Sequence, residues 1–157
     1  MGRIDISLLK PELVFLDVKV ADRAELFLLL EQQLAERGYI EQTWLDAVTE
    51  RERLYPTGLA CPTMHVAIPH TDPEHLTRPY IAIVRPLEPV VFEPMGGIGD
   101  AVQVELIINL GLLAHAEDQV AVLQAFMELL MDGDAVAQLR VSETPADMIE
   151  AITRCCA

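Results

Sequence analysis

The chain has 157 residues, of which 52% are hydrophobic, and this length and composition suit one folded domain and exclude a disordered chain. Its formal net charge is −14, and residues 61–157 hold fourteen of the 25 acidic side chains but only four of the eleven basic ones. Such a surface repels nucleic acid and anionic membranes and favours a basic protein partner. No apolar segment is long enough to cross a bilayer and the N-terminus lacks a signal-peptide pattern, so we expect a cytoplasmic protein that binds no nucleic acid.

Short β-rich runs alternate with longer helical segments along most of the chain. In chain order, the predicted elements are a strand at 13–20, helices at 21–38 and 43–54, a loop at 55–63, strands at 64–68 and 80–84, a brief extended piece at 89–92, a loop at 94–100, a strand at 102–110, a helix at 117–132, a short helix from about 135 and a last helix from 144 to about 154. Asp22 and Glu25 form a capping-box pattern, Gly38 is a stop signal, and Thr43 is the expected N-cap of the second helix. The alternation predicts an α/β fold in which α-helices sandwich a mixed β-sheet.

The cysteines, Cys61, Cys155 and Cys156, fit neither a disulfide framework nor a zinc-binding spacing. Their number is odd, and two of them are adjacent near the C-terminal end of the sequence. Neither feature points to a chemical role. We therefore expect three passive thiols.

Three of the four histidines lie in one short segment, TMHVAIPHTDPEH, at residues 63–75. His70 follows Pro69 just past a predicted strand, where functional side chains held by a rigid scaffold tend to lie. A neutral imidazole there can act as a metal ligand, a general base or a nucleophile, and the alternative is an ordinary hydrogen-bonded loop histidine. His65, His70 and His75 are spaced five residues apart, which is not a zinc-binding spacing, so no metal is expected. A metal-dependent hydrolase built on these three histidines is a further alternative, which the zinc content of the protein would decide.

Two arginines precede this segment at the end of the second predicted helix. Arg51 and Arg53 are two residues apart and therefore point in different directions, so one can face the His70 loop while the other stays in solvent. The planar fork of an arginine is the side chain best suited to a phosphate. The alternative is that both arginines pair with Glu50 and Glu52 on the surface.

Residues 51–72, RERLYPTGLACPTMHVAIPHTD, resemble the enzyme IIA component of the fructose–mannitol class of bacterial sugar phosphotransferase systems. The features of that family occur here in the same order, at Arg51-Glu52, Pro56-Thr57-Gly58 and Pro69-His70. The flanking elements fit as well, and VAIPHTDP with EPMGG is most similar to the galactitol-type members. The resemblance implies a mannitol-type enzyme IIA fold, with residues 1–157 as a single domain and a core at about 10–152.

The resemblance implies a phosphocarrier, which is a phosphotransferase component with a phosphohistidine intermediate. His70 would accept a phosphoryl group on Nε2 from HPr and pass it to a cysteine of a cognate enzyme IIB during sugar uptake, with the membrane enzyme IIC involved indirectly. If Nδ1–H donates to a backbone carbonyl, Nε2 keeps its lone pair for this attack. Arg51, Thr57 and Gln119 would stabilise the phosphoryl group, and neither a cofactor nor a metal is required.

The chain departs from the family at one position. Many fructose- and mannitol-type members carry a second histidine at the start of the late helix, where this chain has Gln119. A glutamine can donate a hydrogen bond but carries no charge. We expect His115 to be a surface histidine, and His65 and His75 match no family position.

Two questions of function stay open at this level. A regulatory role is the alternative to transport, because members of the nitrogen-related branch bind their targets according to phosphorylation state. No sugar pocket can be identified, so the sequence does not define the sugar beyond a galactitol-type preference. The excess of acidic residues fits a docking surface for HPr, which is basic around its own histidine, and it also fits simple solubility.

Overall fold

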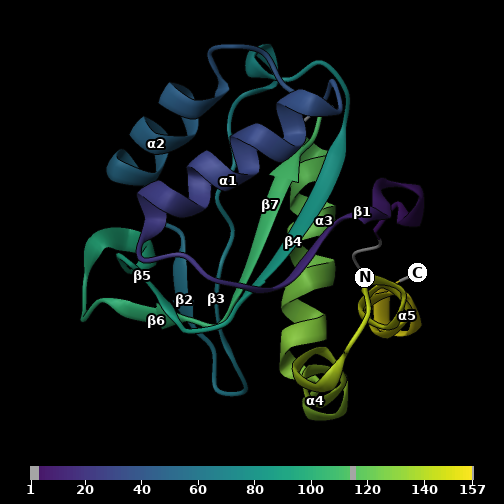
Figure 1. Ribbon diagram of the computed structural model, residues 1–157. Coiled ribbons are helices and arrows are strands. Elements are labelled where there is room, and N and C mark those ends of the chain that lie inside the picture. The colour runs from purple at the N-terminus through teal and green to yellow at the C-terminus, as the bar shows by residue number, and fades with distance from the viewer. Residues whose placement is uncertain (1–3, 114–115, 157) are drawn as a thin grey trace.

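The computed structural model describes residues 4–113 and 116–156 (Figure 1). The elements are, in order, β1 (Leu9–Val18), α1 (Arg23–Glu36), α2 (Trp44–Leu54), β2 (Gly58–Ala60), β3 (His65–Ala67), β4 (Tyr80–Pro86), β5 (Val90–Phe92), β6 (Val102–Val104), β7 (Leu106–Gly111), α3 (Ala116–Met131), α4 (Gly133–Val141) and α5 (Pro145–Cys156). Short 3₁₀ turns lie at Ile6–Leu8, Pro73–His75 and Met95–Gly97. No helix in the described ranges has the length and apolar character needed to cross a membrane.

The main sheet has five strands in the order β1-β4-β7-β3-β2. Strand β1 is parallel to β4, and β3 is parallel to β7, whereas the β4–β7 and β2–β3 pairs are antiparallel. A separate antiparallel pair joins β5 to β6. The sheet is therefore mixed, as the alternation of strands and helices predicted.

Helices cover both faces of this sheet, with α1 and α2 on one side and α3 on the other (Figure 1). Alternate residues of the central strands point to opposite faces, so each strand contributes to two apolar cores. In β7, Ile108 packs with residues of α3 and α5, while Ile107 packs with residues of α1 and α2. This arrangement confirms the predicted α/β fold in which helices sandwich a mixed sheet.

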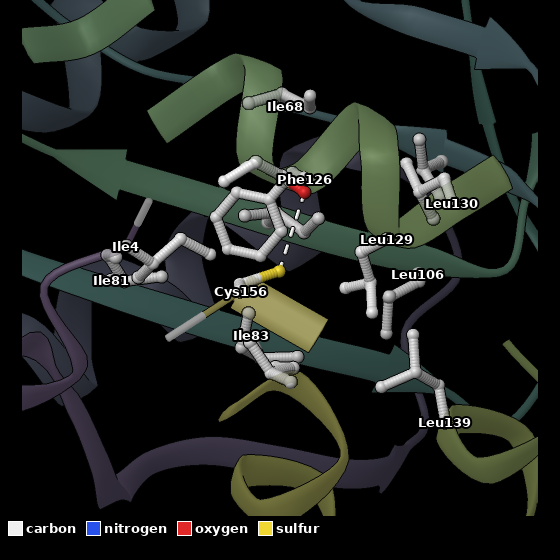
Figure 2. Close-up of a cluster of buried hydrophobic side chains, with 14 of the residues drawn as sticks. Ile4, Ile68, Ile81, Ile83, Leu106, Phe126, Leu129, Leu130, Leu139 and Cys156 are labelled. Atoms are coloured by element: carbon white, nitrogen blue, oxygen red, sulfur yellow. Dashed lines mark hydrogen bonds between the residues drawn. The ribbon is translucent and has the colours of Figure 1, made fainter. Parts of the chain in front are cut away.

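The core that contains Ile108 also contains Cys156, the last residue of α5. Figure 2 shows Cys156 among Ile4, Ile83 and Phe126, with its Sγ 3.4 Å from the carbonyl oxygen of Ala125. Burial is the main cause that raises the pKa of Cys156, to about 12, so its thiol stays protonated. All three cysteines are free.

The helix signals in the sequence are confirmed with one exception. Asp22 accepts a hydrogen bond from the amide of Glu25 at 3.0 Å, and the Glu25 carboxylate accepts one from the amide of Ala21 at 2.6 Å. Thr43 does occupy the N-cap of α2, but its side chain makes no capping hydrogen bond. The hydroxyl of Thr43 lies instead 2.8 Å from Nδ1 of His75, so a tertiary contact has replaced the local one.

Two strand predictions were wrong in detail. The predicted loop at 55–63 contains β2, a three-residue edge strand that pairs with β3 as a short hairpin; its sequence Gly-Leu-Ala, between Pro56 and Pro62, has no β-branched residue and is typical of a loop. The predicted strand at 102–110 is two strands, because the chain changes from the β5–β6 pair to the main sheet at Glu105. The amide of Glu105 donates to the carbonyl of His65 at 2.9 Å, and its carboxylate accepts from the amide of His65 at 3.1 Å.

Candidate functional site

His70 lies just beyond β3, where the chain leaves the sheet beside β7. A parallel bridge joins His70 to Leu110, and Nδ1 of His70 lies 2.8 Å from the carbonyl oxygen of Ile68. Because a carbonyl oxygen only accepts, Nδ1 carries the proton and donates it. In the neutral ring, Nε2 therefore keeps its lone pair, and among the described residues no group is hydrogen-bonded to it.

The surroundings of His70 favour the neutral ring. Burial is the main cause that lowers the pKa of His70, and the positive charge of Arg51 acts in the same direction. The hydrogen bond to Ile68 and the negative charge of Asp72 oppose this shift without reversing it. The site thus holds an uncharged nucleophilic nitrogen near a permanent cation.

This lowered pKa gives a prediction for the titration of His70. Its carbon-bound ring protons, followed by NMR, should titrate with a midpoint below the ordinary value of 6.5, while the same histidine in urea-unfolded chain should titrate near that value. The unfolded chain then binds the proton at higher pH than the folded chain. The contribution of His70 to the free energy of unfolding is therefore complete above the ordinary pKa and decreases as the pH falls through the window below it. A folded midpoint at or above the urea midpoint would contradict this reading of the site.

Arg51 lies in the last turn of α2 and faces the His70 loop. Its Nη1 lies 3.2 Å from Oδ1 of Asp72, and its guanidinium carbon lies 5.8 Å from the ring centroid of Tyr55. Arg53 points elsewhere and forms an exposed pair with Glu50, with 2.5 Å between Nη2 and Oε1. Surface pairing with a neighbouring glutamate, considered for both arginines, thus describes Arg53 alone.

Glu52 is buried and fixes the loop after α2. Its carboxylate accepts hydrogen bonds from the amide of Thr57 at 2.7 Å and from the Thr57 hydroxyl at 2.8 Å. The same hydroxyl oxygen accepts from the amide of Ile68 at 3.1 Å. The proton of Thr57 is therefore committed to Glu52 in this structure, and Thr57 connects the α2 loop to the residues just before His70.

Burial makes the Glu52 carboxyl group a weaker acid. It raises the pKa of Glu52, although the two hydrogen bonds from Thr57 and the charges of Arg23 and Arg51 act against it. A carboxylate in this position is costly to bury, and the hydrogen bonds from Thr57 are what compensate for it. The alternative considered from the sequence, in which Glu52 pairs with an arginine on the surface, does not hold, because Glu52 is 4% exposed and is hydrogen-bonded to Thr57.

A cleft of about 380 Å³ opens beside these residues. Its lining residues are Arg51, Leu54, Tyr55, Pro56, Thr57, His70, Met95, Gly96 and Gly97. A second hollow is lined by His70, Thr71, Leu110, Leu112 and Leu123. His70 therefore borders two partly apolar hollows, and Met95, Gly96 and Gly97 from the β5–β6 connection line the cleft.

The remaining candidate residues lie in different surroundings. His75 contacts Thr43 and, at 3.6 Å, Glu74, whereas His65 lies in β3 next to Glu105. The three clustered histidines thus do not converge on one point, and among the side chains of residues 4–113 and 120–156 no three His, Cys, Asp or Glu form a group that could hold a metal ion.

The start of α3 is only partly covered by the structure. Gln119 belongs to the first turns of α3, but its side chain lies outside what the structure describes, as does the whole of His115. Leu123, one turn after Gln119, lines the hollow next to His70. The helix that carries Gln119 therefore passes the site.

One buried polar residue near the site was missed by sequence reasoning. Asn109 in β7 is 0% exposed, and its amide nitrogen donates to the carbonyl of Pro69 at 2.9 Å. Its signal was a single asparagine inside the otherwise apolar strand LIINLG. Asp72, which pairs with Arg51, was also missed, since nothing in its local sequence marked it.

Solved structures of mannitol-type enzyme IIA proteins have the same fold. The mannitol-specific cryptic phosphotransferase enzyme IIA CmtB from Escherichia coli matches with a TM-score of 0.73 at 20% identity, covering 96% of this chain and 99% of that chain. The mannitol enzyme IIA from Escherichia coli, solved in complex with phosphorylated enzyme IIB, also matches with a TM-score of 0.73, at 22% identity and over 93% of this chain and 97% of that chain. At these identities the likeness shows the fold, which is the predicted mannitol-type enzyme IIA fold.

The chain belongs to the family described as phosphoenolpyruvate-dependent sugar phosphotransferase system, EIIA 2, which matches residues 7–155. The galactitol-specific EIIA component of Escherichia coli strain K12 is 28% identical over 122 residues, which are 78% of this chain and 80% of that protein. These matches confirm the resemblance seen in the motif. The protein is accordingly a phosphocarrier of a sugar phosphotransferase system, a phosphotransferase component with a phosphohistidine intermediate.

Proposed function

We propose that His70 is the residue that carries the phosphoryl group, bound to Nε2. It accepts the group from the phosphohistidine of HPr and passes it to a cysteine of a cognate enzyme IIB. The observation that carries this proposal is the hydrogen bond from Nδ1 to the carbonyl of Ile68, which leaves the lone pair on Nε2 beside the cleft. The relay operates in the cytoplasm, and the membrane enzyme IIC takes part only through enzyme IIB.

The transfer balances without any co-reactant. The Nε2 lone pair forms the new P–N bond as the P–N bond of HPr breaks, and the donor imidazole keeps that electron pair. The proton stays on Nδ1 and is still donated to the carbonyl of Ile68, so the phosphorylated ring keeps the same hydrogen bond. In the second step a cysteine thiolate of enzyme IIB attacks the phosphorus, and the electron pair of the broken P–N bond returns to Nε2.

Arg51 provides the charge that this transfer needs. During in-line transfer the negative charge is spread over the three equatorial phosphoryl oxygens. A guanidinium in a partly apolar cleft stabilises this charge more than it would in water. Arg51 is already oriented by Asp72 and by the ring of Tyr55. Thr57 supports the loop below, and Gln119 donates a neutral hydrogen bond to the phosphoryl group.

The partners follow from the surroundings of the cleft and from the relatives. Exposed apolar side chains at Leu54, Tyr55 and Met95 border it, in a protein whose net charge is −14. An apolar contact surface on a protein with this net negative charge suits a basic, rapidly exchanging partner such as HPr. The solved complex of a mannitol enzyme IIA with phosphorylated enzyme IIB supports a IIB partner, and the galactitol-specific relative supports a galactitol-type sugar.

The test is a phosphorylation assay with the reconstituted relay. The protein is incubated with phosphoenolpyruvate, enzyme I and HPr, and mass spectrometry locates an acid-labile phosphoryl group on the peptide that contains His70. Addition of a galactitol-type enzyme IIB should remove that group, and a purely regulatory protein would retain it. Absence of label, or label on another histidine, would refute the proposal.

A further inference from the structure

Asn109 is a fully buried amide in the middle of an apolar sheet. It lies in β7 between Ile108 and Leu110, and none of the three is more than 4% exposed. Burying an amide costs free energy unless its hydrogen bonds are made, and a leucine of similar size would serve packing alone. What the amide contacts is therefore informative about why it is there.

The Asn109 side chain connects a buried tyrosine to the residue before His70. Its Oδ1 accepts a hydrogen bond from the Tyr80 hydroxyl at 2.7 Å, and its Nδ2 donates to the carbonyl of Pro69 at 2.9 Å. The amide of Leu110 also donates to that carbonyl, at 3.3 Å. Because Tyr80 donates to Oδ1, the amide cannot turn over, and Nδ2 always faces Pro69.

Tyr80 is itself held on several sides. It is 0% exposed, it packs edge-on against Tyr39 with 5.7 Å between ring centroids, and burial raises the pKa of its phenol, so the hydroxyl stays a donor. Its ring lies against the backbone of Gly111, where an added Cβ would come within 2.0 Å of a ring carbon. The glycine therefore makes room for the ring, and the ring sets the orientation of Asn109.

Two successive carbonyls before His70 are thus fixed by different groups. The carbonyl of Ile68 receives the imidazole Nδ1, and the carbonyl of Pro69 receives Asn109. The Pro69 carbonyl and the His70 amide belong to one planar peptide group, so fixing that carbonyl also fixes the plane from which the backbone of His70 continues. The position of Nε2 depends on both hydrogen bonds.

We propose that Asn109, oriented by Tyr80, is a positioning residue for His70. It acts by fixing the carbonyl of Pro69, and this role rests on the proposed phosphoryl transfer at His70. Transfer between two proteins demands that the attacking nitrogen be aligned with the breaking bond, and a misplacement of about 1 Å costs roughly 100-fold in rate.

The experiment compares Asn109→Leu with a matched control, Ile107→Ala. Ile107 lies on the same strand and the same face and is equally buried, and its aliphatic side chain makes none of the hydrogen bonds that hold His70. Both variants lower thermal stability, so initial rates of phosphorylation by HPr are measured at a temperature at which both are folded. Emission from Trp44, the only tryptophan and a buried residue of the same core, reports that folded state. Asn109→Leu should slow phosphorylation by about 100-fold, and Ile107→Ala should leave it unchanged.

A second readout does not depend on phosphoryl transfer. Nitrogen-15 NMR of the His70 ring should show a protected Nδ1–H in the unchanged protein and in Ile107→Ala, and an exchanging Nδ1–H in Asn109→Leu. If the unchanged protein accepts no phosphoryl group, the proposed function fails, while this measurement still decides the positioning role. A wild-type rate together with a protected Nδ1–H in Asn109→Leu would overturn it.

Tyr80→Phe keeps the proposal testable if Asn109→Leu does not fold. It removes one hydroxyl and leaves the amide of Asn109 in place but free to turn. Its rate of phosphorylation should fall by less than that of Asn109→Leu, and the Nδ1–H of His70 should exchange faster than in the unchanged protein. An unaltered rate and an unaltered ring signal would overturn the role of Tyr80 in the pair.

Discussion

Replacement of His70 by alanine is expected to abolish acceptance of a phosphoryl group from HPr and to leave the chain folded. The change removes the only nitrogen that combines a free lone pair with a place in the cleft, as far as the described residues show. It also removes one hydrogen bond to the carbonyl of Ile68, which costs about 1 kcal/mol of stability. The measurement is the acid-labile label, set beside the thermal unfolding curve of the same preparation.

The matched control for His70 is His75→Ala. His75 lies five residues later, at the end of a short 3₁₀ turn, and its ring is engaged with Thr43 outside the cleft. Its loss should cost a similar small amount of stability and leave labelling complete. Label retained by His70→Ala, or lost equally in both variants, would remove His70 from its proposed role.

Replacement of Arg51 by alanine is expected to slow phosphorylation by about 10²–10³-fold, the loss typical of one charge-stabilising donor. The reason is that in transit the negative charge is spread over the three equatorial phosphoryl oxygens, where a positioned guanidinium stabilises it. Arg51→Lys should recover part of the rate, because lysine restores the charge but not the planar fork. Single-turnover labelling by phosphorylated HPr measures these rates.

Arg53→Ala is the control for Arg51. Arg53 lies on the same turn of α2, carries the same charge and pairs with Glu50 in solvent, with 67% of its side chain exposed. An effect of net charge on docking would slow both variants alike, whereas a direct role slows only Arg51→Ala. An unchanged rate in Arg51→Ala would mean that backbone groups or Gln119 support the phosphoryl group without it.

The sequence predicted most of the fold because its local signals agreed with the tertiary structure. Asp22 and Glu25 mark the start of α1 by chemistry that acts over a few residues, and the strands and helices alternate as the sheet requires. Strand β2 was missed because it is only three residues long and its sequence Gly-Leu-Ala has no β-branched residue. The break at Glu105 was missed because its contact with His65 spans 40 residues of chain. The missing cap at Thr43 also has a long-range cause, because its hydroxyl contacts the ring of His75, 32 residues away, instead of capping α2.

The site could be predicted only as far as its motif. His70, Arg51 and Thr57 were candidates because they are grouped in the sequence, and the structure brings all three to one cleft. Asn109 reaches Pro69 across 40 residues of chain, and no pattern of spacing reveals a contact of that kind. The hydrogen bond from the Thr57 hydroxyl to Glu52 could not be predicted either, because a sequence motif shows which residues occur but not which of their atoms are hydrogen-bonded.

The pair between Arg51 and Asp72 has a consequence for the resting protein. The Arg51 guanidinium already has the Asp72 carboxylate as its counter-ion. Inorganic phosphate and other small anions should therefore gain little free energy by binding there. A phosphoryl group bonded to the His70 ring would compete better than a free anion, because the covalent bond gives it a very high local concentration at the guanidinium. We therefore expect the carrier to bind free anions weakly and, if His70 carries the phosphoryl group as proposed, still to engage that group.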